Sequence, residues 1–291
     1  MKLINRISPV VLFLLLVSGC EHQTEPVESH HNPWWKTEQT VRSQIDRMAT
    51  FHWSDYPRLM TVLSENKFVV LPINEMRSYF DTNKVVVGLR HDVDGNPFKA
   101  LEMAEIEKGY GIRSTYFILA TSSYYGRFED GKVIRNEGMD SLYKRISDTG
   151  AEIGIHNDLL TVMIQYKTDP FEFNTWELDF YKALGISIYG TASHGSEIAK
   201  ETVPNYEIFS DFAKQAKVDY MGSEYPLGIK SLKDFGFDYE SYFIDYKIYY
   251  SDSRGLWNDP EGLNGILDKL EGSKPGDRIQ ILAHPDWWGK N

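Results

Sequence analysis

Short apolar runs alternate with amphipathic segments along most of the chain. The apolar runs have the length of buried strands, and we expect strands at 85–89, 114–119, 152–155, 186–191, 243–250 and 278–283. Between these runs apolar residues recur at helical spacing, which predicts helices at 97–108, 139–148, 171–184, 206–216 and 263–270. An earlier helical pattern starts near Thr37 and places Tyr56, Leu59, Met60 and Leu63 on one face. Strands separated by helices are typical of parallel β/α units, so we predict an α/β fold, either a barrel or a doubly wound sheet.

Several of the expected strands end on side chains that can bind a metal ion or transfer a proton. The stretch Arg90-His91-Asp92-Val93-Asp94-Gly95 follows the first clear strand, and His156, His194 and His284 each end a later one. Charges at the end of a buried strand are costly unless they are paired, hydrogen-bonded or bound to a metal. Because the carboxyl ends of parallel barrel strands converge on one face, these endings favour one shared site.

Aspartate and imidazole are natural ligands of a borderline divalent ion such as zinc. A catalytic zinc site keeps three protein ligands and one open position, where a water becomes a nucleophile near neutral pH. Residues two apart on an extended segment point to the same side, so Asp92 and Asp94 could serve such a site together. The alternative is that both aspartates cap backbone amides before the helix that Pro97 opens. No Gly-X-Ser-X-Gly motif occurs, so a covalent serine mechanism has little support.

Composition narrows the classes of partner. The chain has 291 residues, which suits one large domain, and its net charge of -11 argues against a phosphate-binding surface. We therefore expect no nucleic-acid partner. Aromatic residues make up 14% of the chain, and those that the core does not use could stack on sugar rings.

The N-terminus has the order of a secretory signal. Lys2 and Arg6 precede an apolar run at 10–17, and Leu16-Val17-Ser18-Gly19-Cys20 follows. The apolar run is too short to span a membrane comfortably. The alternative is an ordinary cleaved signal in which Cys20, the one cysteine of the sequence, occurs by chance.

This stretch also resembles the lipobox of bacterial lipoproteins, in which the cysteine is lipidated and becomes the first mature residue. We therefore predict a lipoprotein signal peptide at 1–19, a lipidated tether at 20–36 and a catalytic domain at 37–291. The expected location is the cell envelope, with a membrane anchor on Cys20, and Glu21 points to the outer membrane.

Three stretches together resemble the polysaccharide deacetylase family, the NodB homology domain. They are Arg90-His91-Asp92-Val93-Asp94-Gly95, Glu152-Ile153-Gly154-Ile155-His156 and Ile281-Leu282-Ala283-His284-Pro285, and the resemblance extends over residues 56–288. It implies a distorted parallel β/α barrel that uses one divalent metal ion, usually zinc, to remove acetyl groups from acetylated sugars. Some relatives act on other non-peptide C–N bonds.

The resemblance also implies roles for single residues. Asp92 corresponds to the general base, Asp94 and His156 to metal ligands, and His284 to the general acid. The family usually has another ligand four residues after the first histidine, but Leu160 stands there. We expect His194 to replace it, with Asp158 as the alternative.

A second departure is that the usual arginine motif is not recognisable, although Arg254 could be a distant analogue. Other residues are expected to orient the reacting groups or to contact the substrate, and Asp252 could orient a catalytic histidine. These supporting residues are Arg90, His91, Asp158, Asp252, Arg254, Trp257, Trp287 and Trp288.

The sequence thus predicts a metal-dependent hydrolase that removes an acyl group, acetyl above all, from an amino sugar of an envelope or surface polysaccharide. One alternative is a non-catalytic glycan-binding or assembly lipoprotein on a degenerate barrel. A second alternative is a metal-dependent amidase or esterase with a non-sugar substrate.

Overall fold

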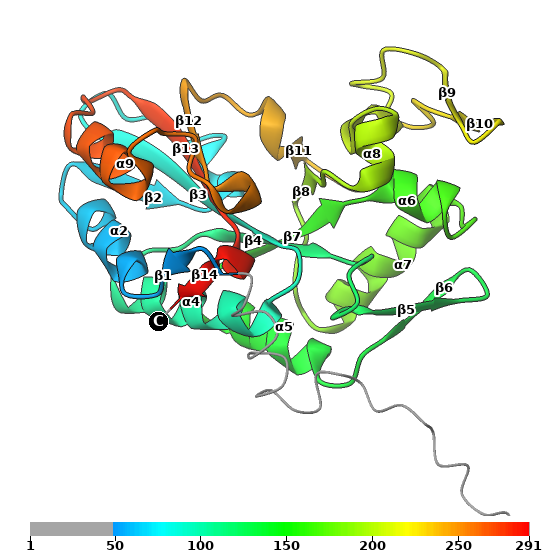
Figure 1. The fold of residues 1–291 in the computed structure, drawn as a ribbon, viewed down its shortest axis with the longest axis horizontal. Coiled ribbons are helices and arrows are strands. Elements are labelled where there is room, and N and C mark those ends of the chain that lie inside the picture. Colours follow the sequence, from blue (N-terminus) through cyan, green and yellow to red (C-terminus); the bar gives the residue numbers. More distant parts are fainter. Residues whose placement is uncertain (1–48, 291) are drawn as a thin grey trace, which may run out of the picture. The chain divides into compact units, whose positions relative to one another are not determined.

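A parallel sheet of eight strands forms the centre of the molecule. The computed structural model describes residues 49–290, so the expected signal peptide, the tether and Cys20 lie outside the described residues. In pairing order the strands are β11 (Tyr239–Glu240), β8 (Gly190–Ser193), β7 (Glu152–Asn157), β4 (Thr115–Leu119), β3 (Val85–Val93), β13 (Arg278–Ala283) and β12 (Ile248–Ser251), and β2 (Phe68–Leu71) pairs with the first half of β3. The sheet curls into a distorted half-barrel, which confirms the predicted α/β fold (Figure 1).

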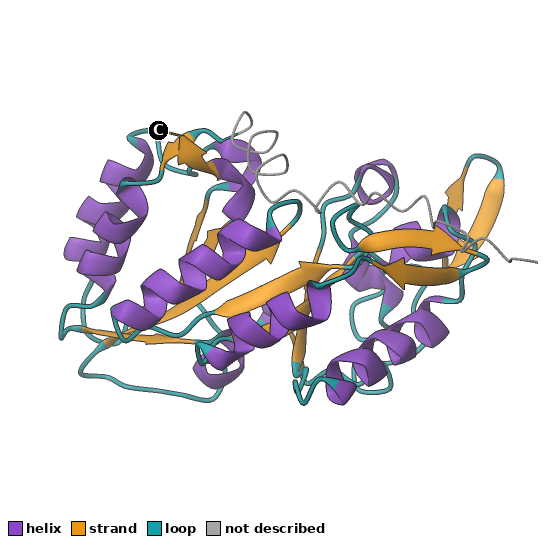
Figure 2. Cartoon of the chain, turned by 90° about the horizontal axis from the view of Figure 1, so that it is seen from below, coloured by secondary structure: helices purple, strands orange, loops and turns teal. Residues whose placement is uncertain are grey.

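Helices connect the strands, as the alternating pattern predicts. They are α2 (Asp55–Leu63), α3 (Ile73–Met76), α4 (Pro97–Gly109), α5 (Met139–Asp148), α6 (Leu159–Ile164), α7 (Pro170–Ala183), α8 (Glu197–Glu201) and α9 (Gly262–Glu271). Figure 2 shows the long helices in front of the strands when the molecule is seen from below. Helix α4 begins where the sequence predicts, because the Asn96 side chain accepts a hydrogen bond from Lys99 N and Pro97 fits the first turn.

Strand β3 is longer than its apolar run predicted. It continues from Val85 through Val93, and every one of its residues is buried. Parallel strands in such sheets are covered on both faces, so their sequences do not alternate between apolar and polar residues. The polar residues after Leu89 therefore did not show where the strand ends. Arg90 and Asp92 therefore lie on one face of β3, whereas His91 lies on the other.

The prediction of a helix at 206–216 is wrong. Only a short 3-10 turn forms there, at η2 (Asn205–Ile208), and Phe209 then makes an isolated parallel bridge with Lys230. Phe209 and Phe212 pack against other aromatic rings. Their three-residue spacing is also typical of one face of a helix, which is why the sequence predicted one. The strands expected at 186–191 and 243–250 are shorter in the structure, where they begin at Gly190 and Ile248.

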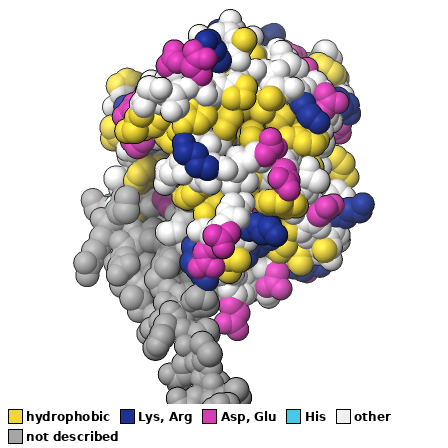
Figure 3. Space-filling view, turned by 90° about the vertical axis from the view of Figure 1, so that its right-hand side faces the viewer, with side chains coloured by type: hydrophobic (Ala, Val, Ile, Leu, Met, Phe, Trp, Pro, Cys, Tyr) yellow, Lys and Arg dark blue, Asp and Glu magenta, His cyan; other side chains and the backbone are white. Residues whose placement is uncertain are grey.

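Three small two-stranded sheets surround the centre. Strand β1 (Phe51–His52) pairs with β14 (Trp288–Lys290), β5 (Gly126–Glu129) with β6 (Lys132–Arg135), and β9 (Lys217–Tyr220) with β10 (Ser223–Pro226). Figure 3 views the right-hand side of Figure 1, where hydrophobic side chains lie among charged ones. Within residues 49–290, no helix has both the length and the apolar character needed to cross a membrane.

Candidate metal centre

The predicted site residues meet at the carboxyl ends of the strands. Asp94 follows β3, His156 is the penultimate residue of β7, His194 follows β8 and His284 follows β13. Together with Asp92 they line one cavity of about 880 Å³. The convergence expected from the strand endings is therefore present, and β7 and β8 are neighbours in the sheet, as are β3 and β13.

Asp94, His156 and His194 have the arrangement of metal ligands. Asp94 Oδ1 lies 3.3 Å from His156 Nε2 and 3.4 Å from His194 Nδ1, and the two imidazole nitrogens are 3.0 Å apart. Ligands of a tetrahedral zinc ion at about 2.0–2.1 Å are separated by roughly 3.3–3.4 Å. Asp94 Oδ1 is buried, and within the described part of the chain it accepts no hydrogen bond of normal geometry. The donor set and its spacing fit a divalent cation.

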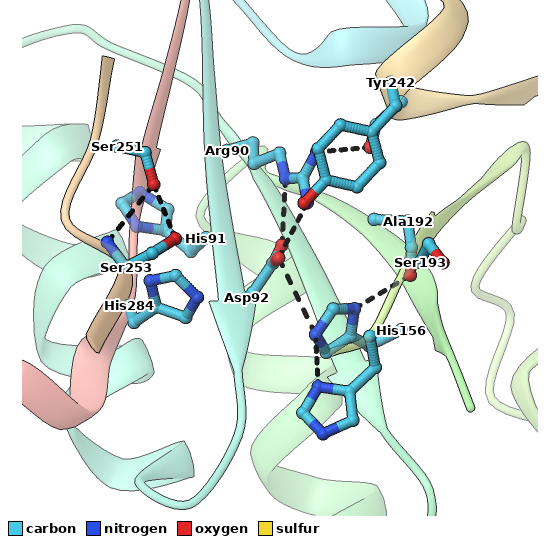
Figure 4. A network of polar contacts seen from close by, with 12 residues as sticks. Arg90, His91, Asp92, His156, Ala192, Ser193, Tyr242, Ser251, Ser253 and His284 are labelled. Carbon is cyan, nitrogen blue, oxygen red and sulfur yellow. Dashed lines mark hydrogen bonds and ion pairs between the residues drawn. The ribbon is translucent and has the colours of Figure 1, made fainter. Parts of the chain in front are cut away.

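The two histidines are oriented by backbone contacts. His156 Nδ1 donates to the carbonyl of Ala192 at 2.8 Å, which leaves Nε2 for the ligand cluster (Figure 4). A metal-binding histidine usually donates its other ring N–H in this way, because the contact fixes both tautomer and ring orientation. The backbone N–H of His194 donates to Asn157 O at 2.8 Å, so the end of β8 is tied to the end of β7.

Between the two possible third ligands, the geometry favours His194. Both carboxylate oxygens of Asp158 already accept hydrogen bonds, Oδ1 from Thr161 and Asn205, and Oδ2 from Thr121. Leu160, at the usual ligand position, is fully buried in the hydrophobic core on α6. Leu160 therefore packs in the core, and the imidazole that completes the ligand cluster is that of His194, which follows the neighbouring strand β8.

Asp92 is held by an arginine on its own strand. Arg90 Nε donates to Asp92 Oδ1 at 3.0 Å and Arg90 Nη2 to Oδ2 at 2.7 Å, and both side chains are buried (Figure 4). Burial alone would raise the pKa of Asp92, but the Arg90 charge, helped by His156, lowers it below the ordinary value. Asp92 therefore stays ionised, with Oδ2 3.6 Å from His156 Nε2.

The arginine that contacts Asp92 is thus Arg90, and Arg254 as a distant analogue of the family arginine stays a prediction. Arg254 is exposed at the edge of the cavity, with a left-handed backbone at φ 62°. Arg90 also donates to Ser241 Oγ and lies over the ring of Tyr242, 4.6 Å from its centroid.

His284 is paired with a carboxylate, as the sequence suggested. Its Nδ1 lies 2.6 Å from Asp252 Oδ1, and Asp252 also accepts from the backbone N–H of His284 and from Trp288 Nε1. Burial lowers the pKa of His284, but the Asp252 carboxylate outweighs burial and raises it to about 10. The imidazole is therefore charged at neutral pH, and Nε2 is the ring nitrogen left to reach a substrate.

Three predicted supporting residues have other tasks. His91 points to the opposite face of β3, where Nδ1 donates to Ala283 O and Nε2 contacts Glu107, so it does not orient the aspartates. Trp257 and Trp288 are buried and pack against each other, so neither can wall a sugar subsite. Of the three tryptophans only Trp287 lines the cavity.

Two carboxylates near the site, the half-buried Asp286 and the buried Glu240, were not predicted. Asp286 approaches Gly95, where a Cβ would lie only 2.5 Å from Oδ1, and burial together with Asp94 raises the pKa of Asp286 to about 7. Glu240 accepts from the backbone N–H groups of Ser193 and Tyr242, and burial raises its pKa to about 7. Asp286 could have been predicted as a site residue because it directly follows His284-Pro285, whereas nothing local in the sequence distinguishes Glu240.

Comparisons with known proteins include a distant structural likeness. No family model matches the chain, and no curated protein matches it significantly. A solved structure, a family 4 carbohydrate esterase from Bacillus anthracis, is similar at 14% sequence identity and a TM-score of 0.32, over 77% of this chain and 75% of that chain. What this chain does therefore has to be inferred from the residues of its own site.

Proposed function

We propose that this chain is a metal-dependent hydrolase that removes an acyl group, acetyl above all, from an amino sugar of an envelope or surface polysaccharide. The observation that carries the proposal is one cavity with a ligand cluster, Asp94, His156 and His194, and two reacting groups of opposite charge, Asp92 and His284. A carboxylate and an imidazolium next to a metal site are the base and the acid that acyl transfer to water requires.

Asp94, His156 and His194 would hold the ion, and zinc suits one carboxylate and two imidazoles. When bound there, a divalent ion polarises an acyl carbonyl and lowers the pKa of a water molecule beside it. The chain's own residues then have to position the substrate, accept one proton and donate another.

Asp92 is the proton acceptor. Arg90 holds its carboxylate in place through two hydrogen bonds and keeps it ionised, so it can take a proton from the attacking water. Its Oδ2 is close to the ligand cluster, as a base acting on water at that position must be.

His284 is the proton donor. Because Asp252 takes the N–H at Nδ1, the N–H at Nε2 of the imidazolium is available for the leaving nitrogen or alkoxide oxygen. The raised pKa means that the acid is loaded with its proton throughout the neutral range. This acid and base pair favours catalysis over a role in glycan binding alone.

The experiment measures acetate released by the zinc-loaded full chain from acetylated saccharides and from small acetyl amides and esters. We expect release from saccharides and a loss of about 10²–10⁴-fold in kcat for Asp92→Asn, with zinc still bound. Asp158→Asn is the matched control, because it changes a carboxylate in the same cavity whose oxygens only bind neighbouring side chains.

Two outcomes would contradict the proposal. Zinc-loaded chain that binds saccharides but releases no acetate would support the non-catalytic glycan-binding alternative. Release from small amides or esters but from no saccharide would support an amidase or esterase with a non-sugar substrate.

We also propose that the chain is attached to a membrane, the outer membrane in particular, through lipid on Cys20. This proposal rests on the signal-like sequence that ends in Gly19-Cys20. Labelling of cells with radioactive palmitate tests it: label should enter the full chain and be lost in Cys20→Ser. Equal labelling of both would contradict it.

A further inference from the structure

A second cavity adjoins the ligand cluster. It has a volume of about 500 Å³, and its apolar wall consists of Tyr206, Tyr242, Phe243 and Pro204. The residues that line both cavities are Ser193, His194, Gly195, Lys200 and Tyr242. The two cavities therefore lie side by side at His194.

One aromatic ring of this wall has an open face. Phe243 stacks on Phe212 with centroids 4.0 Å apart and an interplanar angle of 9°. Tyr206 is 5.0 Å from Phe243 and 6.2 Å from Phe212, so the three centroids form a nearly right-angled triangle at Phe243. Tyr206 thus lies beside the edge of the Phe243 ring, and neither Tyr206 nor Phe212 covers the face opposite Phe212. The side chain is accordingly 51% exposed.

The open ring is held at a fixed place relative to the ligand cluster. Glu240 accepts from Ser193 N and from Tyr242 N, each at 2.8 Å. Ser193 precedes His194 and Tyr242 precedes Phe243, so one buried carboxylate ties the ligand strand to the aromatic segment. Arg90 stacks on Tyr242 from the side of Asp92, as Figure 4 shows.

We propose that the open face of Phe243 is a sugar subsite, on which the ring next to the acylated residue stacks. The inference rests on the proposed function and names its substrate class: a saccharide of at least two rings. The apolar C–H groups on one face of a pyranose suit the negative face of an aromatic ring, while Lys200 and Ser193 offer polar contacts at the border. A single half-exposed ring is too small for a protein partner, which needs about 800 Å² on each side.

The test compares chain length. N-acetylglucosamine and its tetramer are the probes, used with the zinc-loaded full chain, and the ratio of kcat/KM for tetramer to monomer is the readout. We expect the parent to prefer the tetramer and Phe243→Ala to lower the ratio at least tenfold. Phe243→Leu keeps much of the apolar area without a ring and should behave like Ala, whereas Phe243→Trp should preserve the ratio. Phe80→Ala is the matched control, because Phe80 is 68% exposed and lies over Arg278, at the start of β13 and away from the site.

A binding measurement separates this inference from the proposed function. Tryptophan fluorescence of the metal-free full chain should report tighter binding of the tetramer than of the monomer, and Phe243→Leu should weaken tetramer binding at least tenfold. Ring-dependent binding without acetate release would overturn the proposed function and keep the subsite. A parent without preference for the tetramer, or an equal loss for both probes in Phe243→Leu, would overturn the subsite.

Discussion

The pairing of His284 with Asp252 leads to a quantitative prediction for Asp252→Asn. The ordinary pKa of histidine is 6.5, and that of His284 is raised to about 10 although burial acts in the opposite direction. Each pKa unit corresponds to about 1.4 kcal/mol, so the surroundings of His284, with Asp252 foremost among its charged neighbours, together favour the charged imidazole by roughly 5 kcal/mol. Asparagine keeps the size of the side chain and an oxygen for Trp288 Nε1 but removes the charge. Burial, which lowers the pKa, and the remaining Asp94 and Asp92 carboxylates, which raise it, then act against each other, and we expect the pKa of His284 to fall well below 10 in the variant.

The assay is an NMR titration of the histidine ring carbons in the metal-free full chain, with His284→Gln to assign the resonance. Because the charged form is the acid, kcat/KM of the zinc-loaded parent should stay level through neutral pH and then fall at alkaline pH as His284 loses its proton. In Asp252→Asn this fall should occur at a lower pH than in the parent, because the pKa of His284 is lowered.

The same pKa shift has a consequence for folding. A pKa raised in the folded state adds stability that is complete below pH 6.5 and is lost as pH rises through about 10. The free energy of unfolding of the parent should therefore decrease over this range more steeply than that of Asp252→Asn. Titration of His284 near 6.5 in the parent, or an unchanged pKa in the variant, would refute the reasoning.

Two further predictions concern stability. Arg90→Leu leaves the buried Asp92 carboxylate without its cation, so we expect the free energy of unfolding in urea to fall by about 3–5 kcal/mol. The double variant Arg90→Leu/Asp92→Leu should recover much of this loss, whereas a loss under 1 kcal/mol in the single variant would contradict the pairing. Leu160→Ala should cost about 2–5 kcal/mol in the same assay with zinc affinity unchanged, because Leu160 packs in the core; weaker zinc binding in the folded variant would show that the position belongs to the metal site.

The placement of the candidate site could be predicted from the sequence because it depends on topology. Asp94, His156, His194 and His284 follow or end separate apolar runs, and parallel strands bring such endings to one edge. That argument needs only the order of strands and helices, which is the strongest signal in the chain. It also favoured His194 as the third ligand before any distance was known.

Contacts across the fold were much harder to predict. The sequence predicts an orienting role for Arg90, and its two-residue spacing from Asp92 implies a shared face, but burial of both faces of β3 hid the end of the strand, so the particular carboxylate that Arg90 holds could not be predicted. Glu240 and Asp286 reach the site only through long-range packing, for which the chain has no local pattern. The aromatic residues at 206–212 led to the opposite mistake, a local pattern that predicted an element the structure lacks. They have helical spacing, but they lie in an irregular segment where their rings contact one another.

Zinc affinity tests most directly the claim that Asp94, His156 and His194 form a metal site. Metal-free full chain is titrated with zinc against a chromophoric chelator. We expect one zinc per chain in the parent, an affinity at least about 100-fold weaker in His194→Ala, and nearly parental affinity in Asp158→Ala. No zinc bound by the parent, or equal affinity in His194→Ala, would contradict the account.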